Sequence, residues 1–330
     1  MVVRERPLRL LSVVAPMCDE EGNAATFCDR VRTALHGLPF ELIVVDDGSR
    51  DGTAAAVAAQ AAVDPRVKLL RLSRNWGHQT ALTAGLDRAS GDVVVSLDGD
   101  LQDPPELIPA LLERWRGGAD VVSAVRRSRA GERRFKLVTA RWFYRLLGRL
   151  SDTPVQPDAG DFRLLDRRAL DAVLAMRERN RYLRGMTAWV GYPQATVSYD
   201  REARRRGATK YTVGRMLRFS FDAIASFSHA PLQLATLLGF LFAFVAFLGM
   251  PISIAFRAFG QFVPGVTTVL LVVLLLGGIQ LIAVGLIGEY VSRIYDEVKA
   301  RPLYLVAEEV NLAPRDPLPE PEDPRIGATP

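Results

Sequence analysis

Short apolar runs and segments with helical spacing alternate strictly from residue 10 to residue 125. Five runs rich in Val, Ile and Leu are too continuously apolar for a sheet with one face in water, and they predict buried β-strands at residues 10–15, 41–45, 67–72, 92–97 and 120–125. Between them, the spacing predicts helices over 21–35, 51–62, 78–89 and 105–115. This alternation predicts an α/β domain with a mostly parallel sheet covered on both faces.

Two long runs without any charged residue follow in the second half, at 232–256 and 266–287. Each is long enough to cross a bilayer core of about 30 Å at about 1.5 Å per residue. We expect a two-helix membrane hairpin; a pair of buried core helices is the alternative. The link at 257–265 carries one charge, whereas both outer flanks are rich in Arg and Lys, which predicts a cytoplasmic location for both termini. Residues 1–16 lack the pattern of a cleavable signal peptide.

These patterns divide the chain into four parts: a cytosolic domain at 1–211, an interfacial amphipathic helix at 212–230, the transmembrane hairpin at 231–290 and a cytosolic C-terminal tail at 291–330. A second basic amphipathic helix is expected over 135–150, where it would lie in the membrane interface or cap the core. Glycines 277, 278, 285 and 288 would allow close helix approach, so self-association through the membrane helices is one expectation.

The net charge of +5 is concentrated in two basic clusters, at 126–149 and 201–218. Such clusters bind nucleic acid, anionic lipid or phosphorylated substrates, and the neighbouring membrane segments favour lipid headgroups and phosphates over nucleic acid. The two cysteines, Cys18 and Cys28, have no metal-ligand spacing and are expected to be free thiols. No Gly-x-Gly-x-x-Gly follows the first strand and no Gly-x-x-x-x-Gly-Lys occurs in the chain, which argues against a dinucleotide oxidoreductase and a P-loop ATPase.

Acidic residues gather where the predicted strands end. The carboxyl ends of parallel strands share one sheet edge, so "VVDDGSRDGT" and "SLDGDLQD" are expected to meet in space. Asp98 and Asp100 point to the same side of an extended turn, which suits a hard divalent cation but also an ordinary solvated acidic turn. Asp46 and Asp47 suit hydrogen bonds to a nucleobase or ribose; a helix start capped by Ser49 or Asp51 is the alternative.

Seven motifs occur in the same order as in one known family: "VVAPMCDEEGN", "VVDDGSRDGT", "RNWGHQTALTAGL", "LDGDLQDPPE", "AGDFRLLDR", "GATKYTVGRMLRFSFDAIASFS" and "GEYVSRIYDEVKARPLY". Over residues 8–306 the chain resembles the family-2 glycosyltransferases that act on polyprenyl phosphates. It looks like the branch with two C-terminal spans, the bactoprenol glucosyltransferases of the GtrB type, and is more distantly similar to dolichol-phosphate mannose synthase. The resemblance implies a GT-A fold, which is Rossmann-like with a mostly parallel sheet, plus two C-terminal transmembrane helices.

The resemblance also implies a donor site. The residues that match the family's nucleotide-binding positions are Pro16, Glu20, Asp46, Asp47 and Asp98. Those that match its Asp-x-Asp-x-Gln set, which binds Mg²⁺ or Mn²⁺ on the diphosphate, are Asp98, Asp100 and Gln102. The chain has Thr209 where the family usually has Ser, and Asp19 where it usually has Asn, so one contact on the nucleotide side is expected to differ. His78 begins a predicted helix and is expected to be a local hydrogen-bonding residue outside the site.

For the acceptor, the basic positions implied to neutralise a lipid phosphate are Arg126, Arg129, Lys136, Arg163, Arg204 and Lys210. A solvated basic face against anionic lipid is the alternative for each of them. Asp158 and Asp161 stand where the family has its candidate general base. A lipid monophosphate, with a second pKa of about 6, is already largely ionised at neutral pH, so we expect orienting or electrostatic roles for both aspartates instead.

The sequence therefore predicts a metal-dependent enzyme of the inner membrane. It would transfer a hexose, with glucose as the expected sugar, from a UDP-sugar to an undecaprenyl-type phosphate on the cytoplasmic face. The transfer would invert the configuration of the sugar. Another donor, such as GDP-mannose, is the first alternative, and a non-catalytic nucleotide-sugar-binding membrane scaffold is the second. A processive polysaccharide synthase is disfavoured because the Gln-x-x-Arg-Trp motif is absent.

Overall fold

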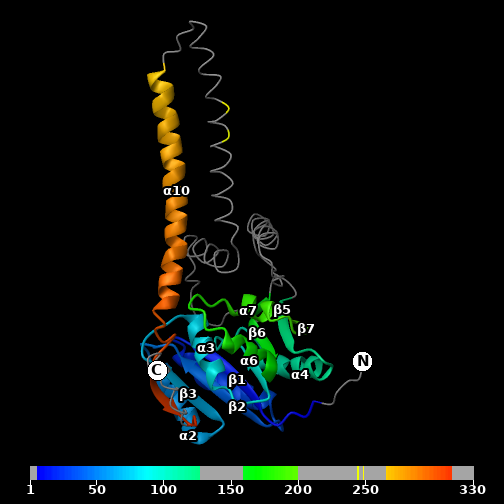
Figure 1. Ribbon diagram of the computed structural model, residues 1–330. Coiled ribbons are helices and arrows are strands. Elements are labelled where there is room, and N and C mark those ends of the chain that lie inside the picture. Colours follow the sequence, from blue (N-terminus) through cyan, green and yellow to red (C-terminus); the bar gives the residue numbers. More distant parts are fainter. Residues whose placement is uncertain (1–5, 127–158, 200–243, 245–247, 249–264, 314–330) are drawn as a thin grey trace, which may run out of the picture.

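The computed structural model describes residues 6–126, 159–199, 244, 248 and 265–313. Both predicted amphipathic helices and most of the first uncharged run lie outside these ranges. Within them, the chain forms an α/β domain from which one long helix projects (Figure 1).

The domain is organised around one eight-stranded sheet in the order β7-β5-β6-β4-β1-β2-β3-β8. The strands are β1 (Leu11–Met17), β2 (Phe40–Asp46), β3 (Val67–Leu72), β4 (Val93–Ser96), β5 (Val121–Arg126), β6 (Ala159–Asp166), β7 (Gln194–Tyr199) and β8 (Val306–Val310). The centre of the sheet, β4-β1-β2-β3, is parallel throughout, and β5 pairs with β7 in parallel. β6 pairs antiparallel with both β4 and β5, and β8 pairs antiparallel with β3.

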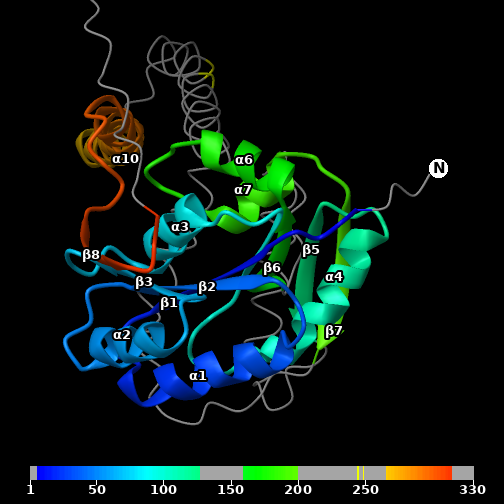
Figure 2. The same ribbon diagram turned by 90° about the horizontal axis from the view of Figure 1, so that it is seen from below.

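Helices cover both faces of this sheet, as Figure 2 shows. They are α1 (Glu21–Ala34), α2 (Thr53–Val63), α3 (His78–Arg88), the short 3₁₀ helix η1 (Pro105–Leu107), α4 (Ile108–Arg116), α6 (Arg167–Ala175) and α7 (Leu183–Trp189). Successive strand residues point to opposite faces, so Val13 and Ala15 pack in the core beneath α1, α2 and α4, while Val14 packs in the core beneath α3, α6 and α7. Strands buried on both faces explain the continuous apolar runs in the sequence.

The predicted α/β domain with a mostly parallel sheet is confirmed, with all five predicted strands and four predicted helical segments near their expected positions. The last of these helices begins with the 3₁₀ turn η1, whose N-cap is Pro104 and whose first residue is Pro105. Proline is tolerated there because the first residues of a helix have no intrahelical partner for a backbone N–H. Three strands were not predicted: β6, β7 and β8. Neither cysteine forms a disulfide; Cys18 is exposed and Cys28 is buried.

The second uncharged run lies in α10 (Val266–Val298), a single helix of 33 residues that projects away from the sheet (Figure 1). Within the described residues, no helix combines the length and the hydropathy needed to span a bilayer. The helix continues through residue 290, which was the predicted end of the hairpin.

After α10 the chain returns to the domain, so the predicted C-terminal tail contributes a strand of the sheet. β8 pairs with the outer edge of β3, and Ser73 donates its backbone N–H to Leu305 O at 2.9 Å. Beside it, the Tyr304 hydroxyl donates to Asp87 Oδ2 at 2.8 Å, and Arg88 pairs with Glu309 at 3.0 Å. The residues that follow α10 are thereby fixed to the sheet edge next to the loop that follows β3.

Candidate functional site

Hydrogen bonds and a close backbone contact join the segments that follow β1, β2 and β3 at one edge of the sheet. Asp47 N donates to Met17 O at 2.9 Å, and Asp19 N donates to Ser49 Oγ at 3.0 Å. Gly48 has a φ of +64°, and a Cβ built on it would lie 2.3 Å from the carbonyl carbon of Arg74. Only glycine permits this backbone-to-backbone approach, so the three segments form one rigid wall.

That wall encloses a cavity of about 210 Å³, whose lining includes Pro16, Cys18, Asp47, Asn75 and His78. Pockets that surround a whole drug-sized ligand measure about 300–1,000 Å³, so this cavity has room for one end of a nucleotide. Of the predicted nucleotide-binding residues, Pro16 and Asp47 lie in its lining. Glu20 lies just before α1, where its carboxylate accepts a hydrogen bond from Asn23 at 2.5 Å.

Asp46 and Asp47 organise the turns around the cavity. Both oxygens of Asp47 accept backbone hydrogen bonds, from Trp76 N at 2.7 Å and Gly77 N at 3.0 Å. Burial raises the pKa of Asp47 and outweighs these two hydrogen bonds, which lower it. Asp46 accepts from Ser49 N at 3.1 Å, and its other oxygen lies 3.4 Å from Arg71 Nε. The N-cap of α2 is Gly52, and Asp51 Oδ1 accepts from the backbone N–H of Thr53, the first residue of α2, at 3.0 Å.

The acidic turn after β4 lies beside this cavity. Asp100 Oδ1 accepts from Gln102 N at 3.1 Å, and the turn passes through Leu101 with a φ of +62°. The Asp98 side chain is 29% exposed, but its Oδ1 is buried without a hydrogen-bond partner, 3.6 Å from His78 Nε2. Burial raises the pKa of Asp98 to about 6; His78 opposes this rise, and the neighbouring aspartates reinforce it. No group of three or more His, Cys, Asp or Glu side chains within the described ranges is arranged to hold a metal ion.

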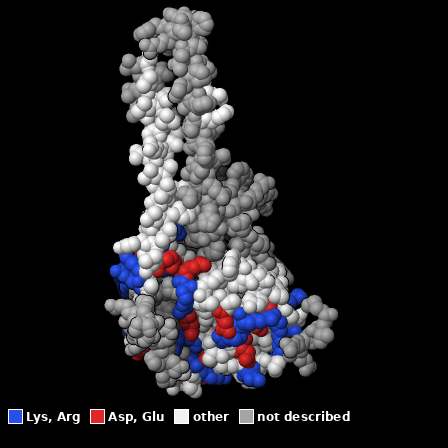
Figure 3. Space-filling view, viewed as in Figure 1, with Lys and Arg blue, Asp and Glu red and all other residues white. Residues whose placement is uncertain are grey.

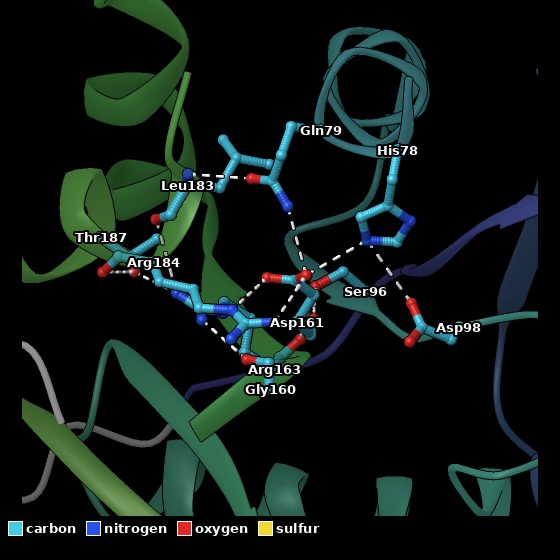
Figure 4. Close-up of polar contacts among 10 residues, drawn as sticks. All are labelled: His78, Gln79, Ser96, Asp98, Gly160, Asp161, Arg163, Leu183, Arg184 and Thr187. Atoms are coloured by element: carbon cyan, nitrogen blue, oxygen red, sulfur yellow. Dashed lines mark hydrogen bonds and ion pairs between the residues drawn. The ribbon is translucent and has the colours of Figure 1, made fainter. Parts of the chain in front are cut away.

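Asp161, on β6, is the centre of a charged cluster drawn in Figure 4. Arg184 Nε donates to its Oδ1 at 2.9 Å and Arg184 Nη2 to its Oδ2 at 3.0 Å, while His78 and Gln79 approach Oδ2 at 3.1 and 3.2 Å. The residue is 6% exposed. Burial by itself would raise the pKa of Asp161, but the His78 hydrogen bond and the Arg184 charge outweigh it and hold this pKa well below its usual range. A carboxylate held by this many donors is a weak proton acceptor, which favours the orienting role over that of a general base.

Arg163 points into the protein interior and is 4% exposed. Its guanidinium donates to Gly160 O at 2.8 Å and to the hydroxyl of Thr187. Burial lowers its pKa to about 10, and the charge of Asp161 partly offsets this effect. In this arrangement Arg163 contacts protein groups. Arg184 also pairs with Asp161, and its side chain is the more exposed of the two arginines. The contact of Arg163 with an acceptor phosphate stays a prediction, and in this structure its guanidinium bonds protein groups instead.

The other predicted acceptor residues and the predicted catalytic residue Asp158 lie at the limits of the described ranges or beyond them. Arg126 ends β5, opposite Tyr199 of β7. Residues outside the described ranges are Arg129, Lys136, Asp158, Arg204 and Lys210.

Three residues of the cluster were not among the predicted site residues: His78, Gln79 and Arg184. His78 was expected to lie outside the site, but it contacts Asp161 and lines the cavity. His78 follows the loop after β3, so the rule that placed the acids at strand ends applies to it as well. Burial opposes a charge on His78, but its hydrogen bond with Asp161 and the charges of Asp98 and Asp161 raise its pKa to about 9. Arg184 belongs to α7, and no local pattern indicates that this helix packs beside β6.

Comparison with known proteins identifies relatives along almost the whole chain. The family model "Glycosyl transferase family 2" matches residues 12–174. An uncharacterized glycosyltransferase, sll0501 of Synechocystis, is 43% identical over 90% of this chain and 95% of its own length. The bactoprenol glucosyl transferase of Shigella phage SfV is 40% identical over 91% of this chain and 98% of its own. Among solved structures, glucosyl-3-phosphoglycerate synthase from Mycobacterium tuberculosis is 26% identical with a TM-score of 0.47, covering 66% of this chain and 79% of that one.

Proposed function

The chain belongs to glycosyltransferase family 2, and we propose that it transfers a hexose, most simply glucose, from a UDP-sugar to a polyprenyl phosphate of the undecaprenyl type. One geometric observation carries the proposal: the preformed cavity, the acidic turn and the Asp161–Arg184 pair lie next to one another at the carboxyl edge of the sheet. The similarity to bactoprenol glucosyl transferases over nearly the full length of both chains supports glucose and a polyprenyl phosphate as the substrates.

On the donor side, the base would enter the cavity beside Asp47, with the diphosphate toward Asp98 and Asp100. The buried, unpartnered Asp98 Oδ1 in an acidic turn fits Mg²⁺ or Mn²⁺, a cation that takes only one or two carboxylates from the protein and completes its shell with phosphate and water oxygens. Gln102 remains the third predicted ligand. Bound there, the cation would stabilise the charge on the departing diphosphate.

On the acceptor side, an oxygen of the lipid phosphate attacks C1 of the sugar. The bond between C1 and the UDP oxygen breaks, UDP leaves with its electron pair, and the configuration at C1 inverts. The nucleophile carries its charge already, so no residue has to remove a proton. Asp161 holds Arg184 in place, and Arg184 provides positive charge where two anionic substrates must approach one another.

We further propose that α10 and the uncharged run before it anchor the enzyme in the inner membrane as a two-helix hairpin, with the catalytic domain and both termini in the cytoplasm. Large apolar side chains are exposed along α10, among them Leu281 at 74% and Ile282 at 73%. In Figure 3 the visible charged side chains lie in patches on the domain and near the base of α10, while the upper part of α10 shows none. Such a surface suits contact with lipid tails, next to which the acceptor phosphate would lie.

Release of UDP from purified full-length protein in detergent tests the proposal. A panel of sugar nucleotides, including UDP-glucose and GDP-mannose, is incubated with and without undecaprenyl phosphate, Mn²⁺ and chelator. We expect release from UDP-glucose that needs both lipid and metal and falls by at least about 100-fold in Asp100→Asn. If GDP-mannose were turned over and UDP-glucose were not, the donor would be GDP-mannose. UDP binding without lipid-dependent release would indicate the non-catalytic scaffold.

A further inference from the structure

His78 lies between two carboxylates that belong to different halves of the site. Its Nε2 is 3.1 Å from Asp161 Oδ2 and 3.6 Å from Asp98 Oδ1 (Figure 4). Ionised carboxylates only accept hydrogen bonds, so Nε2 carries the hydrogen and donates it to one partner at a time. At present Asp161 receives it, and the buried Asp98 Oδ1 has no hydrogen-bond partner.

The backbone around His78 is held from both sides. Asp47 accepts from Gly77 N, directly before it, and the side chain of Gln79, directly after it, donates to Asp161 and accepts from Leu183 N at 3.1 Å. The imidazole itself is 43% exposed and lines the cavity. The backbone that carries the ring is therefore fixed, while the ring itself can donate a hydrogen bond to either of two carboxylates.

Three donors compete for one oxygen of Asp161, because Arg184, Gln79 and His78 all approach its Oδ2. A stronger bond from His78 would weaken the bond from Arg184. Arg184 is also the more exposed partner, since 32% of its side chain is accessible against 6% for Asp161.

We propose that His78 is a positioning residue that couples the donor half of the site to the acceptor half. In the structure His78 and Arg184 both bond Asp161. When the donor side occupies Asp98, Asp161 remains as the acceptor for the His78 Nε2–H. Asp161 then keeps this bond when an acceptor phosphate draws Arg184 away, which lowers the cost of moving Arg184 to the phosphate. Donor and lipid then bind with positive coupling, which by reciprocity is the same whichever binds first. This inference rests on the proposed function, because it requires a lipid phosphate as acceptor.

The test measures the dissociation constant of UDP with Mn²⁺ by calorimetry, in detergent, with and without undecaprenyl phosphate. For the wild type we expect the lipid to tighten UDP binding by about fivefold or more, at the lower end of typical coupling between sites. The ratio of the UDP dissociation constants without and with lipid should fall to about one in His78→Leu. In His78→Gln, which keeps a side-chain N–H donor, this ratio should lie between one and the wild-type value. His36→Gln, an exposed histidine in the turn after α1, serves as the matched control and should keep the wild-type ratio.

A ratio in His78→Leu equal to that of the wild type would overturn the inference, as would a wild type that binds UDP without any effect of lipid. If His78→Leu does not fold, as judged by thermal unfolding, the Gln variant decides: it should fall between one and the wild-type ratio. UDP release is measured on the same wild-type preparation. Absence of lipid-dependent release contradicts the proposed function itself, whereas normal release with unchanged coupling in the variants contradicts only the role of His78.

Discussion

The two halves of the site are built in different ways. Around the donor cavity, backbone groups of three neighbouring segments contact one another directly, through Asp47 N to Met17 O and through the close approach of Gly48 to Arg74. Around Asp161, the contacts are made by charged side chains from α3, β6 and α7. Backbone packing gives a cavity whose shape is set before ligand binding, while exchangeable side-chain hydrogen bonds give a cluster that can rearrange.

The largest effect is expected from Asp161→Asn, which removes a buried negative charge that Arg184, Arg163 and His78 surround. Loss of one partner of a buried charged cluster costs about 3–5 kcal/mol, and turnover should fall with it. Thermal unfolding and UDP release check both effects. Asp171→Asn, at an exposed ion pair with Arg167 3.5 Å away, is the matched control and should change stability by less than about 1 kcal/mol.

The pH dependence of the residual activity separates two roles for Asp161. If it orients Arg184, the pH–rate profile of Asp161→Asn keeps the shape of the wild-type profile at a lower level. Disappearance of a titrating limb would instead identify Asp161 as the general base.

A smaller effect is expected on the donor side from Gly48→Ala. Alanine at a positive φ costs about 1–2 kcal/mol, and here its Cβ would also overlap the Arg74 backbone. We expect a loss of stability together with a raised KM for the sugar nucleotide. Gly37→Ala is the matched control, because Gly37 has a φ of +80° but nothing within 4 Å of the added Cβ. Equal effects of the two variants on KM would show that the donor wall is not rigid.

The smallest effect concerns the scaffold shared by both halves. The hydrogen bonds from Arg66 are the main cause that lowers the pKa of Asp64 to about 2; burial opposes it and Arg32 assists. A carboxyl with a lowered pKa stabilises the fold above its unfolded pKa of about 3.9 and loses that contribution as the pH falls toward 2. Because Arg66 is half exposed and solvent screens its charge, we expect Asp64 to contribute about 1–2 kcal/mol to the free energy of unfolding at pH 7.

Thermal unfolding between pH 7 and pH 2.5 measures this contribution. Asp64→Asn should lower stability at pH 7 and converge with the wild type at the acid end. Asp29→Asn removes an exposed partner of the same Arg32 and should leave the curve almost unchanged. Neither substitution should alter the KM for either substrate, so a changed KM in Asp64→Asn would mean that the scaffold and the site are not separate.

By itself the sequence determined the first five strands, the helices between them and the acids at the strand ends, because a strand buried on both faces must be apolar along its whole length. The resemblance of seven ordered motifs indicated the family. Both kinds of signal are local, and each depends only on the residues within one short segment.

Only the tertiary structure decided how β6, β7 and β8 are placed and which polar side chains meet. The β6 sequence carries Asp161 and Arg163, both buried, so the apolar pattern that marks a buried strand is interrupted there. Their burial is tolerated because partners arrive from α3 and α7, and those contacts depend on the insertion of β6 between β4 and β5. A polar residue can be buried only where distant segments supply its hydrogen bonds, and that supply is a property of the fold and not of the local sequence.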